Sequence, residues 1–295
     1  MTGRDDGNGF VRCSYGHLHW GLHGAAGLLL TDPERGVLLQ RRAWWVHHGR
    51  TWALPGGALE AGETPREAAT REAEEEAAIS PHVLRPTAAS TIDHVNWRYT
   101  TVLATARHPV RERVANSESA ELRWVPADEV TDLRLHRDFA SAWPALREHL
   151  DRELVLVVDA ANVVGSRPDG WWRDRKGAAE RLRDKLAALA KAGLHDTALE
   201  AAAGREWSWW PRIVLVVEGQ ARGIAPVDDV EVVQADTDGD SAIVQVVKDA
   251  RAGRPDDHVV VVTADRELRS RVDAEGAGVL GPGTLLTLLD EVETS

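Results

Sequence analysis

Three glutamates on one face of a predicted helix are the residues of this chain best suited to phosphate chemistry. Glu72, Glu75 and Glu76 stand at positions i, i+3 and i+4, so a helix would place their carboxylates side by side. Like charges at this spacing cost roughly 0.2–0.5 kcal/mol per pair. A hard divalent cation reverses that cost, because Mg²⁺ takes oxygen ligands from carboxylates and substrate phosphates. The spacing therefore favours a divalent-metal site.

The residues before these glutamates predict a loop followed by a capped helix. Residues 55–62 contain one proline and three glycines, which no helix interior would carry. Thr64 is a good N-cap, Pro65 fits the first helical position, and Glu67 completes a Thr-x-x-Glu capping box. The helix is expected to stop at Pro81. Considered alone, this helix could also be a solvated surface element.

Together, the loop and the helix resemble the Nudix box. The spacing Gly-x5-Glu-x7-Arg-Glu-Ala-x-Glu-Glu-x-Ala-Ile carries the resemblance. The matching residues are Gly57, Glu63, Arg71, Glu72, Ala73, Glu75, Glu76 and Ile79. Ala78 stands where the pattern has glycine, which would serve as a left-handed C-cap. Alanine at that position costs about 1 kcal/mol and changes no metal ligand. The alternative to a metal-binding helix is a solvated surface helix with an i,i+4 ion pair between Glu67 and Arg71.

The resemblance implies a hydrolase that cuts the pyrophosphate link of nucleoside diphosphate derivatives with Mg²⁺ or Mn²⁺. Its implied metal ligands are Glu72, Glu75, Glu76 and the Gly56 carbonyl. By the same analogy Glu63 and Arg71 brace the loop against the helix and take part in the catalytic group, while Arg42 and Gly57 contact the substrate. For Arg42 a solvated surface charge is the alternative. The leading substrate expectation is a nucleoside triphosphate, with oxidised nucleotides included.

Several further residues near the box allow two interpretations. Trp44, Trp45 and Trp52 could stack on a base, but large aromatic residues more often belong to the core. An acidic residue from the segment 117–126 assists a metal or activates water in some Nudix enzymes, which makes Glu118 and Glu121 candidates. Ordinary surface glutamates are the alternative for both.

Composition indicates a two-domain protein that does not rely on bulk attraction to polyanions. The chain has 295 residues, which suits two domains, here predicted as residues 1–150 and 151–295. One cysteine excludes an internal disulfide framework. The net charge of −12 argues against nonspecific binding to nucleic acid or anionic membrane. Without a signal segment or a long apolar run, we expect a cytoplasmic protein that does not enter a membrane.

Outside the box, the pattern of the first half predicts four strands and a closing helix, and the Nudix resemblance implies an α/β/α sandwich with a mixed sheet. Residues 1–15 are expected to form a loose lead-in. The expected strands and closing helix lie at 25–30, 37–40, 87–93, 99–106 and 136–150.

The second half alternates apolar runs with helices, the pattern of a parallel, Rossmann-like α/β sheet. The expected strands are 154–158, 213–217, 230–233 and 258–262. The expected helices are 176–192, 241–252, 266–274 and 283–290.

Acidic residues recur where the strands of this second half end. In parallel sheets, ligands bind outside the carboxyl ends of the strands. Asp159, Glu218, Asp240 and Asp265 fall there, although helix capping is an alternative for Asp240 and Asp265. Within the segment 236–240, Asp240 is preferred to Asp238 as the candidate metal ligand, because Asp240 is predicted to open the following helix.

The runs VVDAAN, DTDGDSAIVQ and VVTADREL around these acids resemble the acidic motifs of the NYN branch of PIN-like nucleases. The resemblance implies a second metal site at Asp159, Asp240 and Asp265, and RNA as a partner. The basic and aromatic residues that could hold RNA are Trp171, Trp172, Arg173, Arg175 and Lys176. The alternatives to a Nudix hydrolase are therefore an RNA-processing enzyme and a nucleotide-sensing binding protein. The sequence leaves the oligomeric state open.

Overall fold

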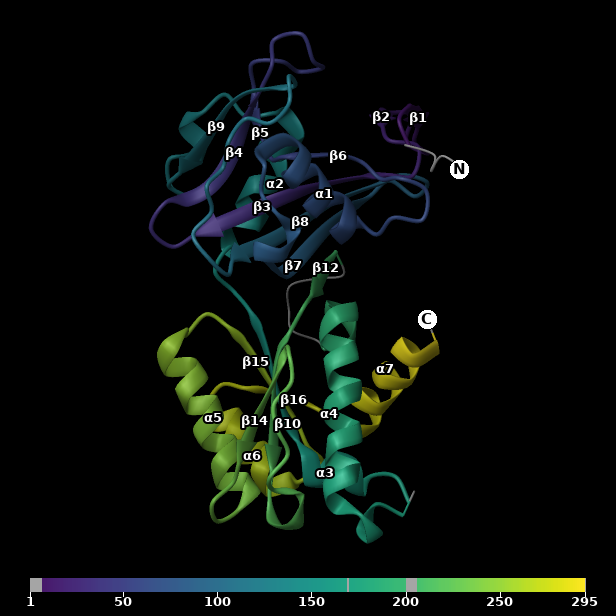
Figure 1. Ribbon diagram of the computed structural model, residues 1–295, viewed down its shortest axis with the longest axis vertical. Helices are drawn as coiled ribbons and strands as arrows, with labels where there is room; N and C mark the ends of the chain where they lie inside the picture. Colours follow the sequence, from purple (N-terminus) through teal and green to yellow (C-terminus); the bar gives the residue numbers. More distant parts are fainter. Residues whose placement is uncertain (1–6, 169, 200–205, 295) are drawn as a thin grey trace. The chain divides into compact units, whose positions relative to one another are not determined.

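The chain divides into two compact units, unit 1 (Met1–Asp151) and unit 2 (Arg152–Ser295). The structure is a computed structural model that describes residues 7–168, 170–199 and 206–294 (Figure 1). Among those residues, none of the helices combines the length and the apolar character that crossing a membrane requires.

Unit 1 is a strand-rich unit with two α-helices. Its strands are β1 (Phe10–Arg12), β2 (Leu18–Trp20), β3 (Ala25–Asp32), β4 (Gly36–Arg42), β5 (Trp52–Ala53), β6 (Gly56–Ala58), β7 (Leu84–Asp93), β8 (Arg98–Ala106) and β9 (Ser119–Val125). Its helices are α1 (Pro65–Ala77) and α2 (Arg137–Glu148), with short 3₁₀ turns η1 (Pro81–Val83) and η2 (Val130–Asp132).

The sheet of unit 1 is mixed, as the Nudix resemblance implies. Its strands follow the order β7-β8-β3-β4-β5, and β6 and β9 pair with β3 and β4. Strand β3 runs parallel to β8 and antiparallel to β4 and β6. Because nearly every residue of β3 is buried, this strand forms the centre of the core. Helix α1 packs on β3 and β6, which brings the box helix beside the glycine-rich strand that precedes it.

The amino-terminal segment is more ordered than the sequence predicts. The expected loose lead-in over residues 1–15 is wrong for the part that the structure describes, because β1 and β2 form an antiparallel hairpin. A tight turn is available because Gly16 adopts a φ of 85°, which costs glycine little. Phe10 and Trp20 pack edge to face across the hairpin, with ring centroids 5.0 Å apart. Residues 1–6 lie outside the described part of the chain.

Unit 2 contains a parallel sheet and most of the helices. Its strands are β10 (Leu154–Asp159), β11 (Leu194–His195), β12 (Trp207–Trp209), β13 (Arg212–Val217), β14 (Val230–Gln234), β15 (His258–Val262) and β16 (Gly278–Leu280). Its helices are α3 (Ala160–Gly165), α4 (Arg175–Ala192), α5 (Gly239–Gly253), α6 (Arg266–Ala274) and α7 (Pro282–Thr294), and its 3₁₀ turns are η3 (Trp171–Arg173), η4 (Asp196–Ala198) and η5 (Gly219–Ala221).

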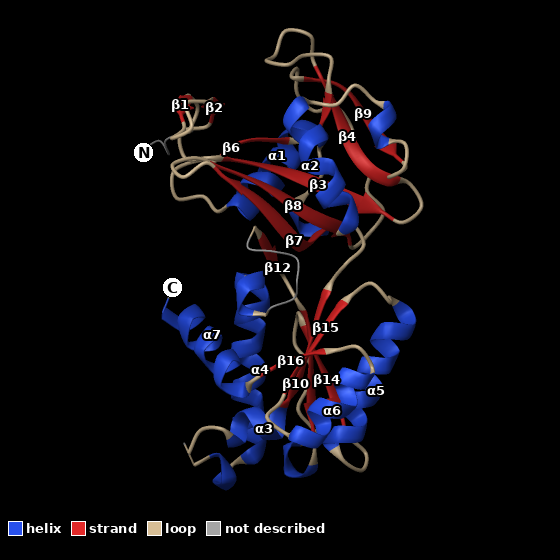
Figure 2. Cartoon of the chain, turned by 180° about the vertical axis from the view of Figure 1, so that it is seen from behind, coloured by secondary structure: helices blue, strands red, loops and turns tan. Residues whose placement is uncertain are grey.

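The main sheet of unit 2 is parallel throughout, as the run of buried apolar strands predicts. Its strands follow the order β14-β13-β10-β15-β16. Helices α5 and α6 lie on one side of the sheet and α4 and α7 on the other (Figure 2). Chain order reverses at β10, which lies between β13 and β15. The carboxyl end of β10, at Asp159, is therefore a topological switch point where such sheets bind ligands.

Candidate functional site

Helix α1 begins with the capping box that the sequence predicts. The Thr64 hydroxyl accepts a hydrogen bond from the Glu67 backbone N–H, and the Glu67 carboxylate accepts one from the Thr64 backbone N–H. Pro65 occupies the first turn. Two backbone donors at the start of the helix are thus satisfied, which fixes where the loop stops and the helix begins.

The other end of helix α1 closes on a left-handed alanine. Ala78 has φ 56° and ψ 35°, and its N–H donates to the carbonyls of Ala73 and Glu74. This confirms the prediction that residue 78 is a C-cap in the left-handed conformation that glycine adopts most easily.

We therefore expect Ala78→Gly to stabilise the protein by about 1 kcal/mol, because glycine enters the left-handed region without a Cβ penalty. Urea unfolding of the variant beside wild type measures the change. An Ala77→Gly control, inside the helix, should destabilise by about the same amount. A loss of stability in Ala78→Gly would contradict this account of the C-cap.

Arg71 ties the box loop to helix α1. Its Nε donates to Glu63 Oε1 (2.8 Å) and its Nη2 donates to Glu63 Oε2 (3.0 Å), a bidentate pair. The same Nη2 donates to the Ala58 carbonyl at 2.9 Å. Glu63 also accepts from the Glu60 backbone N–H at 2.9 Å. Arg71 thus makes three hydrogen bonds to the loop, two to Glu63 and one to the Ala58 carbonyl.

Glu72 and Glu75 both accept hydrogen bonds from the remaining guanidinium nitrogen of Arg71, Nη1. Its Nη1 donates to Glu72 at 2.8 Å and to Glu75 at 3.4 Å. Burial raises the pKa of Glu72, and the charges of Glu75 and Glu63 raise it further against the opposing effect of Arg71. Glu75 is the open member, since 56% of its side chain is exposed. The Glu72 carboxylate is thus largely buried beside an exposed acid on the same helix face.

Glu76 is the buried member of the three glutamates. It is only 3% exposed, and its carboxylate accepts from Gln40 Nε2 (3.0 Å) and from the Gly56 backbone N–H (2.8 Å). Burial raises its pKa to about 7, and Glu72 adds to the shift. A carboxylate in this position gains most from a nearby cation, because the cation restores the charged form that burial disfavours.

Both glycines of strand β6 are required by close approach. A Cβ on Gly56 would lie 2.4 Å from the Ala26 carbonyl oxygen, so the two backbones meet only because Gly56 lacks a side chain. In an extended strand the N–H and C=O of one residue point to the same edge. Since the Gly56 N–H faces Glu76, its carbonyl also points toward the glutamate face. A Cβ on Gly57 would lie 2.4 Å from Glu72 Oε1, so this glycine leaves room for a carboxylate.

The raised pKa of Glu76 gives a pH-dependent stability when no divalent cation is bound. The folded pKa of about 7 lies above the ordinary 4.5, so the folded chain binds this proton more tightly than the unfolded chain. The stabilisation is complete below about pH 4.5 and is lost as pH rises through about 7. At about 1.4 kcal/mol per pKa unit, we expect the unfolding free energy to fall by about 3 kcal/mol from this group.

Urea unfolding in a chelator at several pH values between about 5 and 8 measures this loss. The Glu76→Gln variant, which cannot titrate, should show a correspondingly smaller pH dependence. Equal pH dependence in the two proteins would show that Glu76 does not carry the shifted pKa.

The basic residue predicted to face phosphates is held by the neighbouring loop. Arg42 Nε donates to the His47 carbonyl at 3.1 Å. Its charge also lowers the pKa of Glu76, which places it within electrostatic reach of the glutamates. Glu121 pairs with Arg41 and Arg123, as a surface glutamate would.

The tryptophans before the box differ from one another in exposure. The expectation that all three are core residues is wrong for Trp44 and Trp45, which are 70% and 57% exposed. It holds for Trp52, which is 6% exposed and lies under the Arg123 guanidinium. Glu118, the other acidic candidate of its segment, is also exposed.

The acidic residues of unit 2 gather around the end of β10. Asp159 is 9% exposed, caps α3 through the Asn162 N–H (3.0 Å) and accepts from Thr263 Oγ1 (3.1 Å). Burial raises the pKa of Asp159, and the charges of Asp240 and Glu218 raise it further. The Glu218 carboxylate lies over the start of α5, where it accepts from the Gly239 N–H at 2.8 Å.

The start of helix α5 differs from the sequence prediction. Asp240 does not open the helix, because Asp238 is the N-cap and accepts from the Ser241 N–H at 2.7 Å. Asp240 lies in the first turn, where burial and then the charge of Asp265 raise its pKa. Asp265 caps α6, which was the alternative to its metal-ligand role, by accepting from the Glu267 and Leu268 backbone N–H groups. Asp240 rather than Asp238 is thus the residue whose pKa the neighbouring acids raise.

The predicted basic and aromatic cluster of unit 2 is partly assembled. The Arg175 guanidinium lies 5.3 Å from the ring centroid of Trp171, within cation–π range. Trp172 is 53% exposed and meets Trp171 edge to face. The rings of Trp171 and Trp172 therefore do not stack as two parallel platforms.

The one group of ligand atoms that converges tightly is one that the sequence analysis missed. Over the described part of the chain, Cys13, His17, His19 and His94 are the only group of three or more histidine, cysteine or acidic residues that is placed to hold a metal ion, and their ligand atoms all lie within 4.8 Å of one another. The Cys-x3-His-x-His spacing at residues 13–19 was the available signal. In contrast, each glutamate of the box is paired with Arg71, or with Gln40 and Gly56. Their oxygen donors and the raised pKa values of Glu72 and Glu76 still fit a hard cation.

Comparison with known proteins agrees with the geometry of helix α1. The NUDIX domain family matches residues 21–148. A Mycobacterium tuberculosis protein, named as a candidate 8-oxo-dGTP diphosphatase, is 48% identical over 154 residues, which are 49% of this chain and 70% of that protein. A Bifidobacterium longum protein named as a nucleoside triphosphate pyrophosphatase/Nudix hydrolase fusion is 41% identical over 153 residues, 49% of this chain and 32% of that protein.

Among solved structures, a Nudix hydrolase from M. smegmatis, RenU, is 48% identical and covers 48% of this chain and 94% of its own, with a TM-score of 0.44. The family match and the relatives place the similarity over the unit that carries the braced glutamate helix. The chain belongs to the Nudix hydrolase family.

Proposed function

We propose that unit 1 hydrolyses the phosphoric anhydride of a nucleoside triphosphate, releasing the monophosphate and pyrophosphate, with 8-oxo-dGTP as the leading substrate. The observation that carries the proposal is the placement of Glu72 and Glu76. Both carboxylates are largely buried with raised pKa values, and both lie on the helix face that also presents Glu75. The named activity of the Mycobacterium tuberculosis relative supports the choice of substrate.

Nudix hydrolases generally use divalent metal ions. The residues that would hold Mg²⁺ or Mn²⁺ here are Glu72, Glu75, Glu76 and the Gly56 carbonyl. The chemistry supplied by such a cation is charge neutralisation at the phosphoryl oxygens and activation of a water nucleophile. Preorganisation is the contribution of the protein, because groups already fixed in place need no reorganisation during reaction.

Each supporting residue has a distinct task in that preorganisation. The bidentate Arg71–Glu63 pair holds the loop on helix α1 and fixes Glu72 through Nη1. The Gly56 N–H orients the Glu76 carboxylate, and Gly57 leaves the space that the Glu72 carboxylate fills. Arg42 adds positive charge within reach of the site, where substrate phosphates would carry negative charge.

A nucleotide panel tests the proposal directly. The purified 295-residue protein with Mg²⁺ or Mn²⁺ should convert 8-oxo-dGTP to its monophosphate faster than dGTP, dATP or a dinucleoside polyphosphate. Chromatography of the products identifies the bond that is cut. Preferred cleavage of another nucleotide would change the substrate, and inactivity of the folded protein on the whole panel would favour a nucleotide-binding role.

A second activity, cleavage of RNA by unit 2, is favoured by one specific feature. Asp159 is a nearly buried carboxylate at the switch point of the sheet, and Asp240 and Glu218 raise its pKa. Such a group suits a divalent-metal site with Asp240 and Asp265, because a cation offsets the repulsion. The resemblance of the three acidic runs to NYN-type nucleases supports the same proposal.

RNA cleavage in Mn²⁺ by wild type, Asp159→Asn and Asp238→Asn separates the outcomes. Both substitutions keep a good helix cap, since asparagine caps about as well as aspartate. Only Asp159→Asn should abolish cleavage. Equal cleavage by all three proteins would identify a contaminating nuclease, and no cleavage by any of them would leave unit 2 as a binding module.

A further inference from the structure

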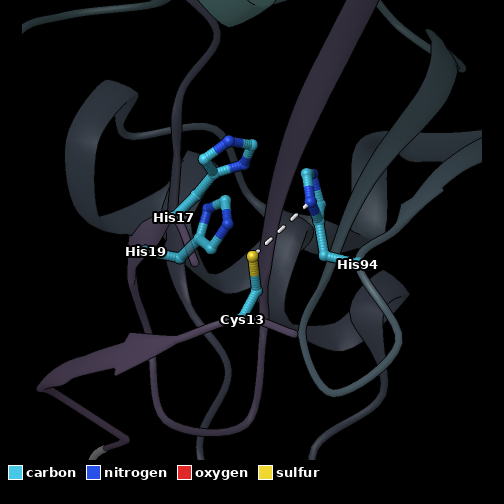
Figure 3. Close-up of side chains that lie close together, drawn as sticks. All are labelled: Cys13, His17, His19 and His94. Atoms are coloured by element: carbon cyan, nitrogen blue, oxygen red, sulfur yellow. Dashed lines mark hydrogen bonds between the residues drawn. The ribbon is translucent and has the colours of Figure 1, made fainter. Parts of the chain in front are cut away.

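A cysteine and three histidines of unit 1 converge on one point (Figure 3). The ligand atoms of Cys13, His17, His19 and His94 all lie within 4.8 Å of one another, and Cys13 Sγ is 3.8 Å from His94 Nδ1. In a tetrahedral zinc site, a Zn–S bond of about 2.3 Å and a Zn–N bond of about 2.0 Å separate sulfur from nitrogen by about 3.5 Å. The observed separation therefore nearly matches one edge of such a tetrahedron.

The turn between β1 and β2 presents three of the four side chains. Cys13 follows β1, and its backbone N–H donates to the His17 carbonyl at 2.8 Å. The Gly16 N–H donates a hydrogen bond to the Cys13 carbonyl at 2.8 Å, which closes the turn. His17 directly precedes β2 and His19 lies within it, and both rings lie beside Cys13 and His94 (Figure 3).

The fourth side chain comes from a distant turn that is tied to the first. His94 lies between β7 and β8, and its N–H donates to the Trp97 carbonyl at 2.8 Å. Asn96 of this turn accepts from the Ser14 N–H (2.8 Å) and donates to the Arg12 carbonyl (3.2 Å). The two turns are thus fixed to each other by hydrogen bonds between the Asn96 side-chain amide and the backbone of the first turn, which do not involve the four converging side chains.

The group is also partly withdrawn from water. Cys13 is 4% exposed, and the ring of His19 stacks on Trp97 at a centroid separation of 4.0 Å. Trp97 is itself anchored by donating from Nε1 to the Gly21 carbonyl at 3.0 Å. His19 Nε2 is buried and has no hydrogen-bond partner in the described part of the structure. Leaving a buried polar atom without a partner is unfavourable, and a metal ion would use the lone pair of this nitrogen.

We propose that Cys13, His17, His19 and His94 bind one Zn²⁺ as a closed structural site, with Nε2 as the ligand atom of His19. One thiolate and three imidazoles are donors that zinc prefers and Mg²⁺ does not, so the site is chemically distinct from the glutamate helix. Binding would release the Cys13 thiol proton and form a sulfur–zinc bond. The ion would then cross-link the β1–β2 hairpin, which carries three ligands, to the β7–β8 turn, which carries the fourth.

Cobalt substitution tests the site with a signal that no other residue can produce. Cys13 is the only cysteine in the chain, so a thiolate-to-cobalt charge-transfer band can arise only here. The reduced 295-residue protein, stripped with a chelator and titrated with Co²⁺, should show this band together with tetrahedral d–d absorption. One equivalent of Zn²⁺ should abolish both signals. An octahedral spectrum without the band would place cobalt on oxygen ligands and overturn the proposal.

Three variants complete the test. Cys13→Ser should lose the band, and His17→Ala, whose side chain is exposed, should bind Zn²⁺ at least about 100-fold more weakly. His108→Ala removes an exposed histidine outside the group and should bind as wild type does. Circular dichroism verifies folding, and His17→Ala carries the test if Cys13→Ser does not fold. Wild-type zinc affinity in a folded His17→Ala protein would refute the four-ligand assignment.

Discussion

Glu76→Gln should lower turnover of the best nucleotide substrate by about 10²–10³-fold while the protein remains folded. Losing one carboxylate from a shared divalent-metal site removes several kcal/mol of charge stabilisation, and each 1.4 kcal/mol is about tenfold in rate. Glu74→Gln is the matched control, because it removes one charge from an exposed position of the same helix. Steady-state kinetics at saturating Mg²⁺ measures both variants, and Glu74→Gln should stay near wild type.

The Glu76→Gln variant has a way to keep its hydrogen bonds. Gln40 Oε1 is buried without a partner in the described structure, while Gln40 Nε2 donates to Glu76. If the Gln40 amide flips, its oxygen accepts from the new amide, whose own oxygen still accepts from the Gly56 N–H. The variant should therefore fold, and the kinetic effect can be attributed to the lost charge. Wild-type turnover in this variant would remove helix α1 from the chemistry.

Gly57→Ala should reduce turnover by about 10²-fold without removing any polar group. The added Cβ would lie 2.4 Å from Glu72 Oε1 and 2.7 Å from Glu72 Cδ, closer than Cβ atoms come to other atoms. The carboxylate is the movable partner, so we expect it to shift away from the metal position. Displacements of about 1 Å in a catalytic group can cost about 10²-fold.

Gly62→Ala is a suitable control for loop strain in the same experiment. Gly62 has a φ of 77°, so alanine there is strained, but no atom lies within 4 Å of the added Cβ. The control should lose some stability and keep its turnover. If both variants lose turnover equally, loop strain rather than the Glu72 carboxylate explains the effect.

The parts of the molecule that follow local rules were predictable. The capping box at Thr64, the left-handed residue at Ala78 and the parallel strands of unit 2 depend on residues close in sequence or on long apolar runs. The short strand β16 and the short helix α3 were missed because three to six residues give too little periodicity. The cap of α5 was misplaced because aspartates at positions 238 and 240 both fit the first turn, and only the backbone distinguishes them.

The parts that depend on contacts between distant segments were not predictable. Burial of Glu76 depends on Gln40 and on strand β6, which no helix pattern reveals. Likewise, the convergence of Cys13 with His94 requires two turns to meet that are far apart in sequence. Residue type alone was misleading for Trp44 and Trp45. Large aromatic residues usually belong to the core, but these two lie in a loop and are exposed.

The hydrogen bond from the Gly56 N–H to the Glu76 carboxylate gives the protein a built-in spectroscopic reporter. This amide donates to a titrating side chain instead of a strand carbonyl, so its nuclear magnetic resonance should follow the charge of that side chain. In metal-free protein the amide proton resonance should move with a midpoint near pH 7, and Glu76→Gln should abolish the movement. Addition of Mg²⁺ at low pH should shift the resonance toward its high-pH position. A single backbone nucleus would then report the ionisation of the site without any substrate.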